Sequence, residues 1–387
     1  MKLGRGSSIG WRYDAPAGGE PRFLCAKHPR IGVGQPALVL AAARMVRDNP
    51  GMSVSARVTI LRETKIFDPA DGFGAVKDAV QVTDASVAKR DGRWWMCLAG
   101  RIHGHEAIQL FSARLPKGAP LSPAGWVIDA DPADASRTVM LAAQERSAPW
   151  DLKGGRHCPA YVKGWDPARG AWVERVYYAG GAENLMGPYT IGYLEWDTER
   201  RRWEDQAESV FAAREEWERG SVYEPNLVWV DGKWRLWYVA GSNAADYLVQ
   251  GFAESLDGRK WVERRTVFAP ELKVFDFNVL RVADGWEAVY SRVHVGVGAA
   301  PASSGLWWCR SEAAVPSADV AEWSEPVQIM TAADRGWHMG PWRPSLQMHE
   351  EDPARRLVFF DGIYRKANDP SPFPFNFTLG CLEFRVD

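Results

Sequence analysis

The chain has 387 residues and a formal net charge of −2 without a long basic run, which argues against nucleic acid and anionic membranes as partners. Its 20 Trp, 36 Gly and 25 Pro favour many short strands joined by turns, and so many aromatic rings suit a surface that stacks on sugars. Five scattered cysteines without a Cys-x-x-Cys pair predict free thiols, and we expect no metal and no cofactor. The first 14 residues contain no apolar signal-like run, so we expect a cytoplasmic protein.

Residues 221–242 contain the clearest local pattern. An apolar run, Asn226–Val230, is followed by Asp231-Gly232 and then by the alternating run Lys233–Gly241. Asp-Gly is the dipeptide that a two-residue hairpin turn prefers, because both turn residues need positive φ. This stretch therefore predicts a β-hairpin, with the pair Glu224-Pro225 at its entrance.

The hairpin pattern recurs, which predicts a repeat architecture. Five units begin near residues 84, 158, 224, 276 and 343, and in the first four a tryptophan leads the fourth strand (Trp126, Trp203, Trp261 and Trp323). Four antiparallel strands repeated five times predict an all-β, five-bladed β-propeller that forms a single domain over residues 1–387. A β-sandwich is the alternative, but it would not repeat tryptophan at the same place in each unit.

The fifth unit offers only three strands before the chain ends at Asp387. A propeller normally closes its ring by borrowing a strand from the other terminus. The alternating run Ser53–Phe67 is the donor that we expect, so residues 1–83 comprise an N-terminal extension and the closing strand. Residues 35–47 fit either a strand or a short helix.

The first strand of each blade lines the channel of a propeller, so residues near its start converge although they are far apart in sequence. These residues are Asp84, Arg156, His157, Cys158, Glu224, Asp276 and Arg343. Buried carboxylates are costly unless they are paired. The arrangement therefore predicts either a functional site or a network of Asp–Arg pairs that holds the blades together.

Two motifs stand at the starts of the first and third units, Thr83-Asp84-Ala85-Ser86-Val87 and Tyr223-Glu224-Pro225-Asn226-Leu227. In these motifs the chain resembles the five-bladed propeller glycoside hydrolases of family 43 (arabinanases and β-xylosidases) and family 32 (invertases). The resemblance implies a small carbohydrate substrate, Asp84 as general base and Glu224 as general acid, with inversion at the sugar. Ala85 departs from the acid-proline pattern of the family.

The larger departure is in the second blade, where the family has a third carboxylate that raises the pKa of the acid and this chain has His157-Cys158-Pro159. Either Asp276 offsets the arginines and takes over that role, or the cations serve an anionic substrate group. The residues that we expect to bind substrate are Arg156, His157, His338, Trp342 and Arg343.

Three functions remain open from the sequence: a glycosidase, a glycoside phosphorylase or enzyme of an anionic sugar, and a non-catalytic sugar-binding propeller.

Overall fold

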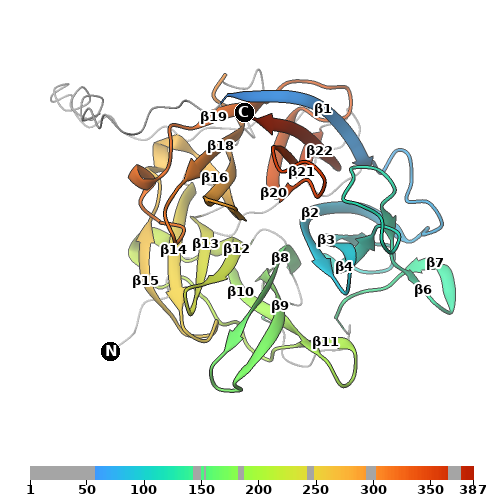
Figure 1. The fold of residues 1–387 in the computed structure, drawn as a ribbon. Helices are drawn as coiled ribbons and strands as arrows, with labels where there is room; N and C mark the ends of the chain where they lie inside the picture. The colour runs from blue at the N-terminus through green and yellow to red at the C-terminus, as the bar shows by residue number, and fades with distance from the viewer. Residues whose placement is uncertain are drawn as a thin grey trace, which may run out of the picture. The chain divides into compact units, whose positions relative to one another are not determined.

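The computed structural model describes residues 57–142, 150–151, 154–181, 187–241, 248–292, 302–364 and 376–387. These residues form five four-stranded antiparallel sheets in a propeller arrangement, and the first strands of successive sheets contact one another around the centre (Figure 1). The predicted all-β, five-bladed β-propeller is confirmed. Residues 35–47 and Ser53–Ala56 lie outside the described residues.

Each blade begins at the channel and its strands follow outward in chain order, except that the outer strand of blade five comes from the N-terminal side of the chain. Blade one contains β2 (Ala79–Arg90), β3 (Arg93–Ile102), β4 (Gln109–Arg114) and β5 (Val127–Ile128). Blade two contains β8 (Gly155–Asp166), β9 (Ala171–Gly181), β10 (Tyr189–Asp197) and β11 (Arg202–Asp205). Blade three contains β12 (Val222–Val230), β13 (Lys233–Gly241), β14 (Leu248–Ser255) and β15 (Trp261–Thr266).

Blade four contains β16 (Val274–Val282), β17 (Gly285–Arg292), β18 (Gly305–Ser311) and β19 (Val327–Thr331). Blade five contains β20 (Gly340–Met348), β21 (Arg355–Tyr364), β22 (Asn376–Val386) and β1 (Val58–Phe67). A small hairpin, β6 (Ala130–Asp131) with β7 (Asp134–Thr138), and three 3-10 turns, η1 (Glu216–Glu218), η2 (Pro270–Leu272) and η3 (Val320–Glu322), complete the described elements. None of the described helices has the length and apolar character needed to span a membrane.

The hairpin turns have the backbone that their sequence predicts. Asp231 and Gly232 have φ of 53° and 72°, and the turn sets Trp229 opposite Trp234. Asp91 and Gly92 repeat the geometry in blade one, with φ of 49° and 70°. Positive φ at both turn residues gives the twist that a two-residue hairpin needs.

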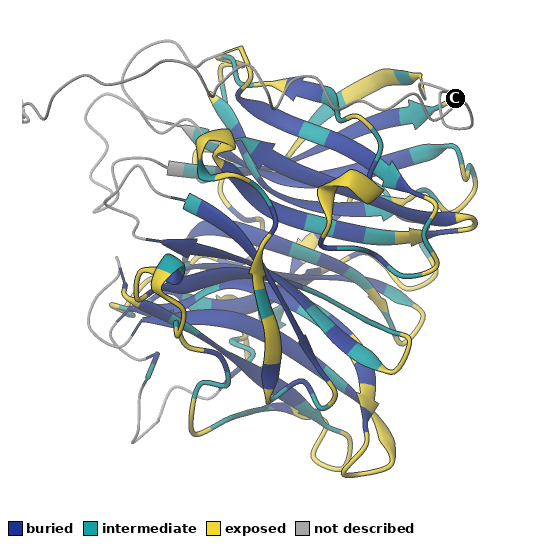
Figure 2. Cartoon of the chain, turned by 90° about the vertical axis from the view of Figure 1, so that its left-hand side faces the viewer, coloured by how far each residue is buried: buried dark blue, intermediate teal, exposed yellow. Residues whose placement is uncertain are grey.

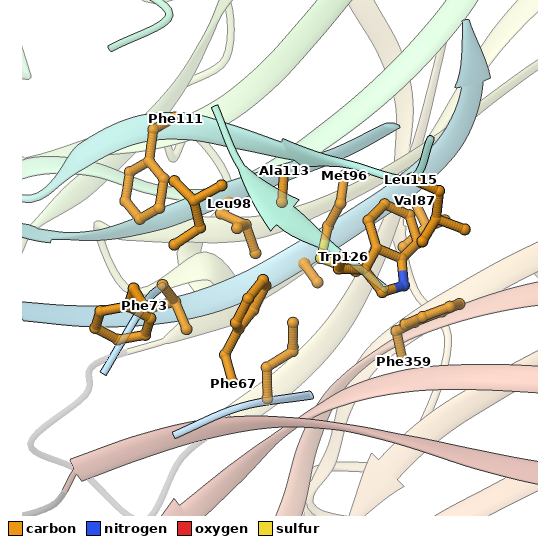
Figure 3. Packing of buried hydrophobic residues seen from close by; sticks show 14 of the residues in the cluster. Phe67, Phe73, Val87, Met96, Leu98, Phe111, Ala113, Leu115, Trp126 and Phe359 are labelled. Atoms are coloured by element: carbon orange, nitrogen blue, oxygen red, sulfur yellow. The ribbon is translucent and has the colours of Figure 1, made fainter. Parts of the chain in front are cut away.

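The N-terminal strand closes the ring, as expected. β1 pairs antiparallel with β22, from Val58 opposite Val386 to Phe67 opposite Leu379. Phe67 also joins a hydrophobic cluster between blades five and one, which contains Phe359 and Trp126 (Figure 3). Because β1 covers the edge of β22, blade five has four strands like the others.

The repeated tryptophans join neighbouring blades. Trp126 packs edge-on against Phe359 of β21, with ring centroids 5.8 Å apart. Trp203 stacks on Trp95 of β3 at 6.0 Å, and Trp261 meets Tyr177 of β9 at 6.1 Å. Each of these three therefore contacts the second strand of the preceding blade, whereas Trp323 contacts Phe277 of its own blade. The sheets are largely buried between their neighbours, and exposed residues gather in the turns (Figure 2).

Side chains also tie the inner strands to each other. The backbone N–H of Tyr161 donates to Ser86 Oγ over 3.0 Å, and that of Val87 donates to Ser345 Oγ over 3.1 Å. Leu346 N–H donates in the same way to Asn278 Oδ1 over 2.9 Å. These bonds hold the first strands of blades four, five, one and two in a common register.

Candidate functional site

A β-bulge interrupts every inner strand at the same place. In β2, Thr83 lies opposite Ala99 and Ser86 opposite Cys97, so two residues of β2 face one of β3. The first bulge residue of each blade has a left-handed backbone, with φ between 50° and 59°; these five residues are Asp84, Cys158, Glu224, Asp276 and Arg343. Non-glycine residues adopt this conformation rarely, and such strain often marks functional sites. They lie inside the inner strands, a few residues after each strand begins.

The bulge explains the acid-proline pair. The second bulge residue is Pro159 in blade two, Pro225 in blade three and Pro344 in blade five. A bulge leaves this residue outside the ladder of hydrogen bonds, so a residue without an N–H is tolerated there. Ala85 and Phe277 take the same place in blades one and four.

The five first bulge residues form a ring, and Arg343 connects its members. Its Nη1 donates to Glu224 Oε2 over 2.7 Å and to Asp276 Oδ1 over 3.2 Å. Its Nη2 donates to the carbonyls of Pro159 and Pro225 over 2.9 and 3.4 Å. A single buried guanidinium thus joins blades two, three, four and five by charge-assisted bonds.

Asp84 completes the ring from blade one. Its Oδ2 accepts the backbone N–H of Cys158 over 3.0 Å. One ligand atom each from Asp84, Cys158 and Glu224 lie within 4.8 Å of one another, and all three residues are buried. The structure therefore brings together all five predicted positions. The same three residues are the described ones that could hold a metal ion, although Arg343 already supplies a cation beside them.

Burial dominates the electrostatics of the ring. It raises the pKa of Glu224 well above its usual range; the charge of Asp276 raises it further, and Arg343 opposes both effects. The pKa of Asp276 rises to about 7, again chiefly because of burial. Desolvation therefore outweighs the guanidinium and favours the protonated form of Glu224.

Blade two contributes neutral groups. Burial raises the pKa of the Cys158 thiol, and the charges of Asp84 and Glu224 add to the effect, so the thiol keeps its proton beside Glu224. Burial lowers the pKa of His157, whose Nε2 lies 2.7 Å from the carbonyl oxygen of Gly154 and donates to it. Cys158 is a free, buried cysteine, as are the other three that the structure describes.

A row of aromatic rings lies next to the ring of bulge residues. Tyr223, Phe275 and Trp342 each precede a bulge residue, and successive centroids are 5.9 and 4.6 Å apart. Tyr189 extends the row toward His157, and Phe377 extends it beyond Trp342. Trp342 and His157 are partly exposed. Aromatic faces of this kind pack well on the C–H faces of sugars.

Two predicted site residues lie elsewhere. Arg156 donates to Asp151 over 3.0 Å and to Asp205 of β11 over 3.3 Å, so its guanidinium is not at the predicted place on the ring. His338 is fully buried, with Nε2 2.7 Å from Glu63 Oε1 of the closing strand and its ring against Trp337 and Phe360. Its contacts belong to blade five and do not reach the bulge residues.

Sequence reasoning missed the residues that surround the ring. Asp361 of β21 accepts the backbone N–H of Asp84 over 2.7 Å, although the two residues are far apart in the chain. Tyr189, Tyr223 and Phe275 were missed as members of the aromatic row. A signal for Asp361 exists, since it follows the apolar run 357–360 and a carboxylate in a buried strand is rare without a partner.

The sequence matches no protein-family model and no curated protein. Solved structures share the fold. A thermostable family 43 glycoside hydrolase is similar over 81% of this chain and 95% of its own, with a TM-score of 0.54 and 12% identity. The catalytic domain of a GH62 α-L-arabinofuranosidase from Coprinopsis cinerea matches over 84% and 97%, at 0.52 and 13%. A family 117 glycoside hydrolase from Zobellia galactanivorans matches over 86% and 90%, at 0.53 and 14%.

These comparisons define a class by fold. The chain is a five-bladed β-propeller of the kind found in glycoside hydrolases of families 43, 62 and 117. At such low identity the likeness establishes the architecture, and the chemistry has to be argued from the residues of this chain.

Proposed function

We propose that this protein is a glycoside hydrolase that acts on a small carbohydrate, with Glu224 as general acid and Asp84 as general base. One observation carries the proposal. Two carboxyl groups from different blades meet at the ring, and burial with the neighbouring charge of Asp276 raises the pKa of Glu224. A pair of carboxyl groups with one held protonated is what glycosidic cleavage needs.

In the proposed reaction Glu224 donates its proton to the glycosidic oxygen as the bond to the sugar breaks. Asp84 removes a proton from the attacking water. Asp276 is fully buried, whereas Asp84 and Glu224 keep 7% and 4% exposure, so we assign Asp276 to tuning rather than to substrate contact. Arg343 holds Glu224 and Asp276 in place through Nη1.

The spacing of the two carboxyl groups bears on the stereochemistry. Asp84 and Glu224 have oxygens within 4.8 Å. Carboxyl groups stand about 5–5.5 Å apart in retaining glycosidases and about 6.5–9.5 Å apart in inverting ones, which need room for water. Inversion, with Asp84 as general base, is what the family resemblance implies, whereas retention would make Asp84 the nucleophile. Proton NMR of the first-formed product anomer decides between the two.

The contacts of the arginines favour hydrolysis over phosphorolysis. Arg343 directs both terminal nitrogens to partners in the protein, and Arg156 is occupied by Asp151 and Asp205. Both guanidinium groups are also buried, which leaves them poorly placed to bind a phosphate or a sugar acid. Trp342 and His157, which are partly exposed beside the ring, are the predicted substrate contacts that the geometry supports.

The test is turnover of a panel of aryl glycosides and short neutral oligosaccharides, with and without inorganic phosphate. We expect sugar release without phosphate in the wild type and none in the Asp84→Asn, Glu224→Gln double variant. Turnover that requires phosphate would indicate a phosphorylase. Saturable sugar binding without turnover would indicate a non-catalytic propeller, and either result would contradict the proposal.

A further inference from the structure

Asp361 is a fourth buried carboxyl group at the site, and it contacts the bulge of blade one. Its Oδ2 accepts the backbone N–H of Asp84 over 2.7 Å and lies 2.8 Å from Thr83 Oγ1. The residue is 1% exposed and belongs to β21, the second strand of blade five. Its position is therefore determined by the strand pairing of blade five, independently of β2.

The other oxygen of Asp361 disfavours the charged carboxylate, since an unpaired buried charge is costly. Among the described residues, Oδ1 has no conventional hydrogen-bond partner although it is buried. The carboxyl groups of Asp361 and Asp84 interact directly, and burial together with the Asp84 charge raises the pKa of Asp361 well above its usual range. Two buried carboxyl groups in contact cannot both ionise readily, so they share one proton.

The donors around the pair decide which member keeps its charge. Asp84 Oδ2 accepts a hydrogen bond from the backbone N–H of Cys158. The charge of Asp84 also acts to raise the pKa of Arg343 and of His157. The titratable groups that face the pair come from blades two to five: His157, Cys158, Glu224, Asp276 and Arg343. The cationic neighbour and the backbone donor lie on the Asp84 side of the pair, so the proton is favoured on Asp361.

We infer that Asp361 is a positioning residue for Asp84: it holds the left-handed backbone of the bulge through the Asp84 N–H, and it keeps the proton of the pair so that Asp84 stays ionised and aimed at the ring. This inference deepens the proposed function and rests on it. The first bulge residue of β2 has φ of 57°, and an acceptor on its N–H stabilises that strained conformation.

The first test does not require activity. A carboxyl group whose folded pKa is raised contributes stability that is present at low pH and is lost as pH rises through that pKa. Asp361→Asn imitates the protonated acid, because its amide can accept from Asp84 N–H and donate to the Asp84 carboxylate. We expect the melting temperature of this variant to fall less than that of the wild type from acid to alkaline pH. A steeper fall in the variant would mean that Asp361 is ionised, and would overturn the inference.

The second test measures kcat and KM over the same pH range. We expect Asp361→Asn to keep kcat within a few-fold, and Asp361→Ala to lose roughly 10²-fold in kcat with little change in KM, as a misplaced catalytic group does. Glu287→Gln is the matched control, since Glu287 is a buried carboxylate on the second strand of blade four that pairs with Arg356. It should lower stability and leave the pH profile of kcat unchanged.

The two tests separate the failures. A wild type that cleaves no glycoside refutes the proposed function, and the unfolding comparison still decides whether Asp361 holds the proton. The positioning role is refuted if the wild type is active and the Asp361→Ala variant loses stability but keeps the wild-type kcat at saturating substrate.

Discussion

Arg343 Nη1 lies 2.7 Å from Glu224 Oε2, yet the pKa of Glu224 is raised rather than lowered. An ion pair of this length would normally favour the charged carboxylate. Here the carboxyl group is buried. Asp276 Oδ1 also accepts a hydrogen bond from the same Nη1 over 3.2 Å, so one guanidinium is shared between two carboxyl groups. The ring therefore contains more carboxyl groups than cations, which favours protonated carboxyl groups. A general acid must carry a proton before it can donate one.

Glu224→Gln tests the acid directly. We expect it to lose about 10²–10⁴-fold in rate on a glycoside with a poor leaving group, and to keep much of the rate on an activated aryl glycoside that needs no protonation. Asp84→Asn should fail on both substrates. Steady-state kinetics on the two substrates provide the measurement, and wild-type rates for Glu224→Gln on both would exclude Glu224 as the acid.

Asp276→Asn tests the tuning of Glu224. Above about pH 7 Asp276 is ionised, and its charge raises the pKa of Glu224. Without this charge Glu224 loses its proton at lower pH, so the alkaline limb of the kcat/KM profile should move to lower pH. An unmoved limb would assign the raised pKa to burial alone.

The same variant also has a stability signature. The pKa of Asp276 rises from 3.8 to about 7 in the folded chain, so its contribution to stability is present at low pH and lost as pH rises toward 7. The melting temperature of Asp276→Asn should therefore fall less over that range than that of the wild type. Asp284→Asn, at an exposed ion pair of the same blade, is the control and should follow the wild type.

Arg343→Ala should destabilise the fold by about 3–5 kcal/mol near pH 8, because it leaves Glu224 and Asp276 buried without their cation. The loss should shrink at acid pH, where both carboxyl groups take up protons. Arg310→Ala, which removes a largely exposed ion pair with Asp284, should cost about 0–1 kcal/mol. Urea unfolding measures both, and a small, pH-independent loss for Arg343→Ala would contradict the central role of this residue.

Because Arg343 is satisfied within the protein, added phosphate or a sugar acid should leave the melting temperature of the wild type unchanged. A clear rise with either anion would restore the alternative of an anionic substrate.

Ala160→Ser should stabilise the chain. Ala160 lies two residues after the bulge residue of blade two, where blades one and five have Ser86 and Ser345 with Oγ bonded to a neighbouring inner strand. Asn226 Nδ2, on the next inner strand, is buried without a partner among the described residues. A new hydroxyl there can accept a hydrogen bond, worth about 0.5–1.5 kcal/mol. The matched variant Ser86→Ala should lose a similar amount of unfolding free energy. Equal unfolding free energies for the wild type and both variants would contradict a stabilising role for these hydroxyl groups.

Removal of β1 should expose the edge of β22 and prevent ring closure. We expect a chain lacking residues 1–67 to be insoluble or to melt far below a chain lacking residues 1–56, which retains β1. The comparison isolates the strand, including the ion pair of Arg62 with Glu383. Identical melting of the two chains would show that β1 is not needed for closure.

The sequence by itself determined the repeat and its closure. Asp-Gly dipeptides specify hairpins through local backbone preferences, and in blades one to three the recurring tryptophan packs against the second strand of the preceding blade. The three-stranded last unit and the strand-like run before Phe67 indicated the closing strand. These features are local or periodic, so they can be read along the chain.

Only the tertiary structure decided the site. A bulge shifts the alternation of a strand by one residue, so Arg343 points to the centre while Arg156 points into its own blade. Asp361 reaches Asp84 through a strand pairing between distant segments. The protonation of Glu224 depends on how desolvation balances one guanidinium against several carboxyl groups, and that balance exists only when five strands bring these charges together out of water.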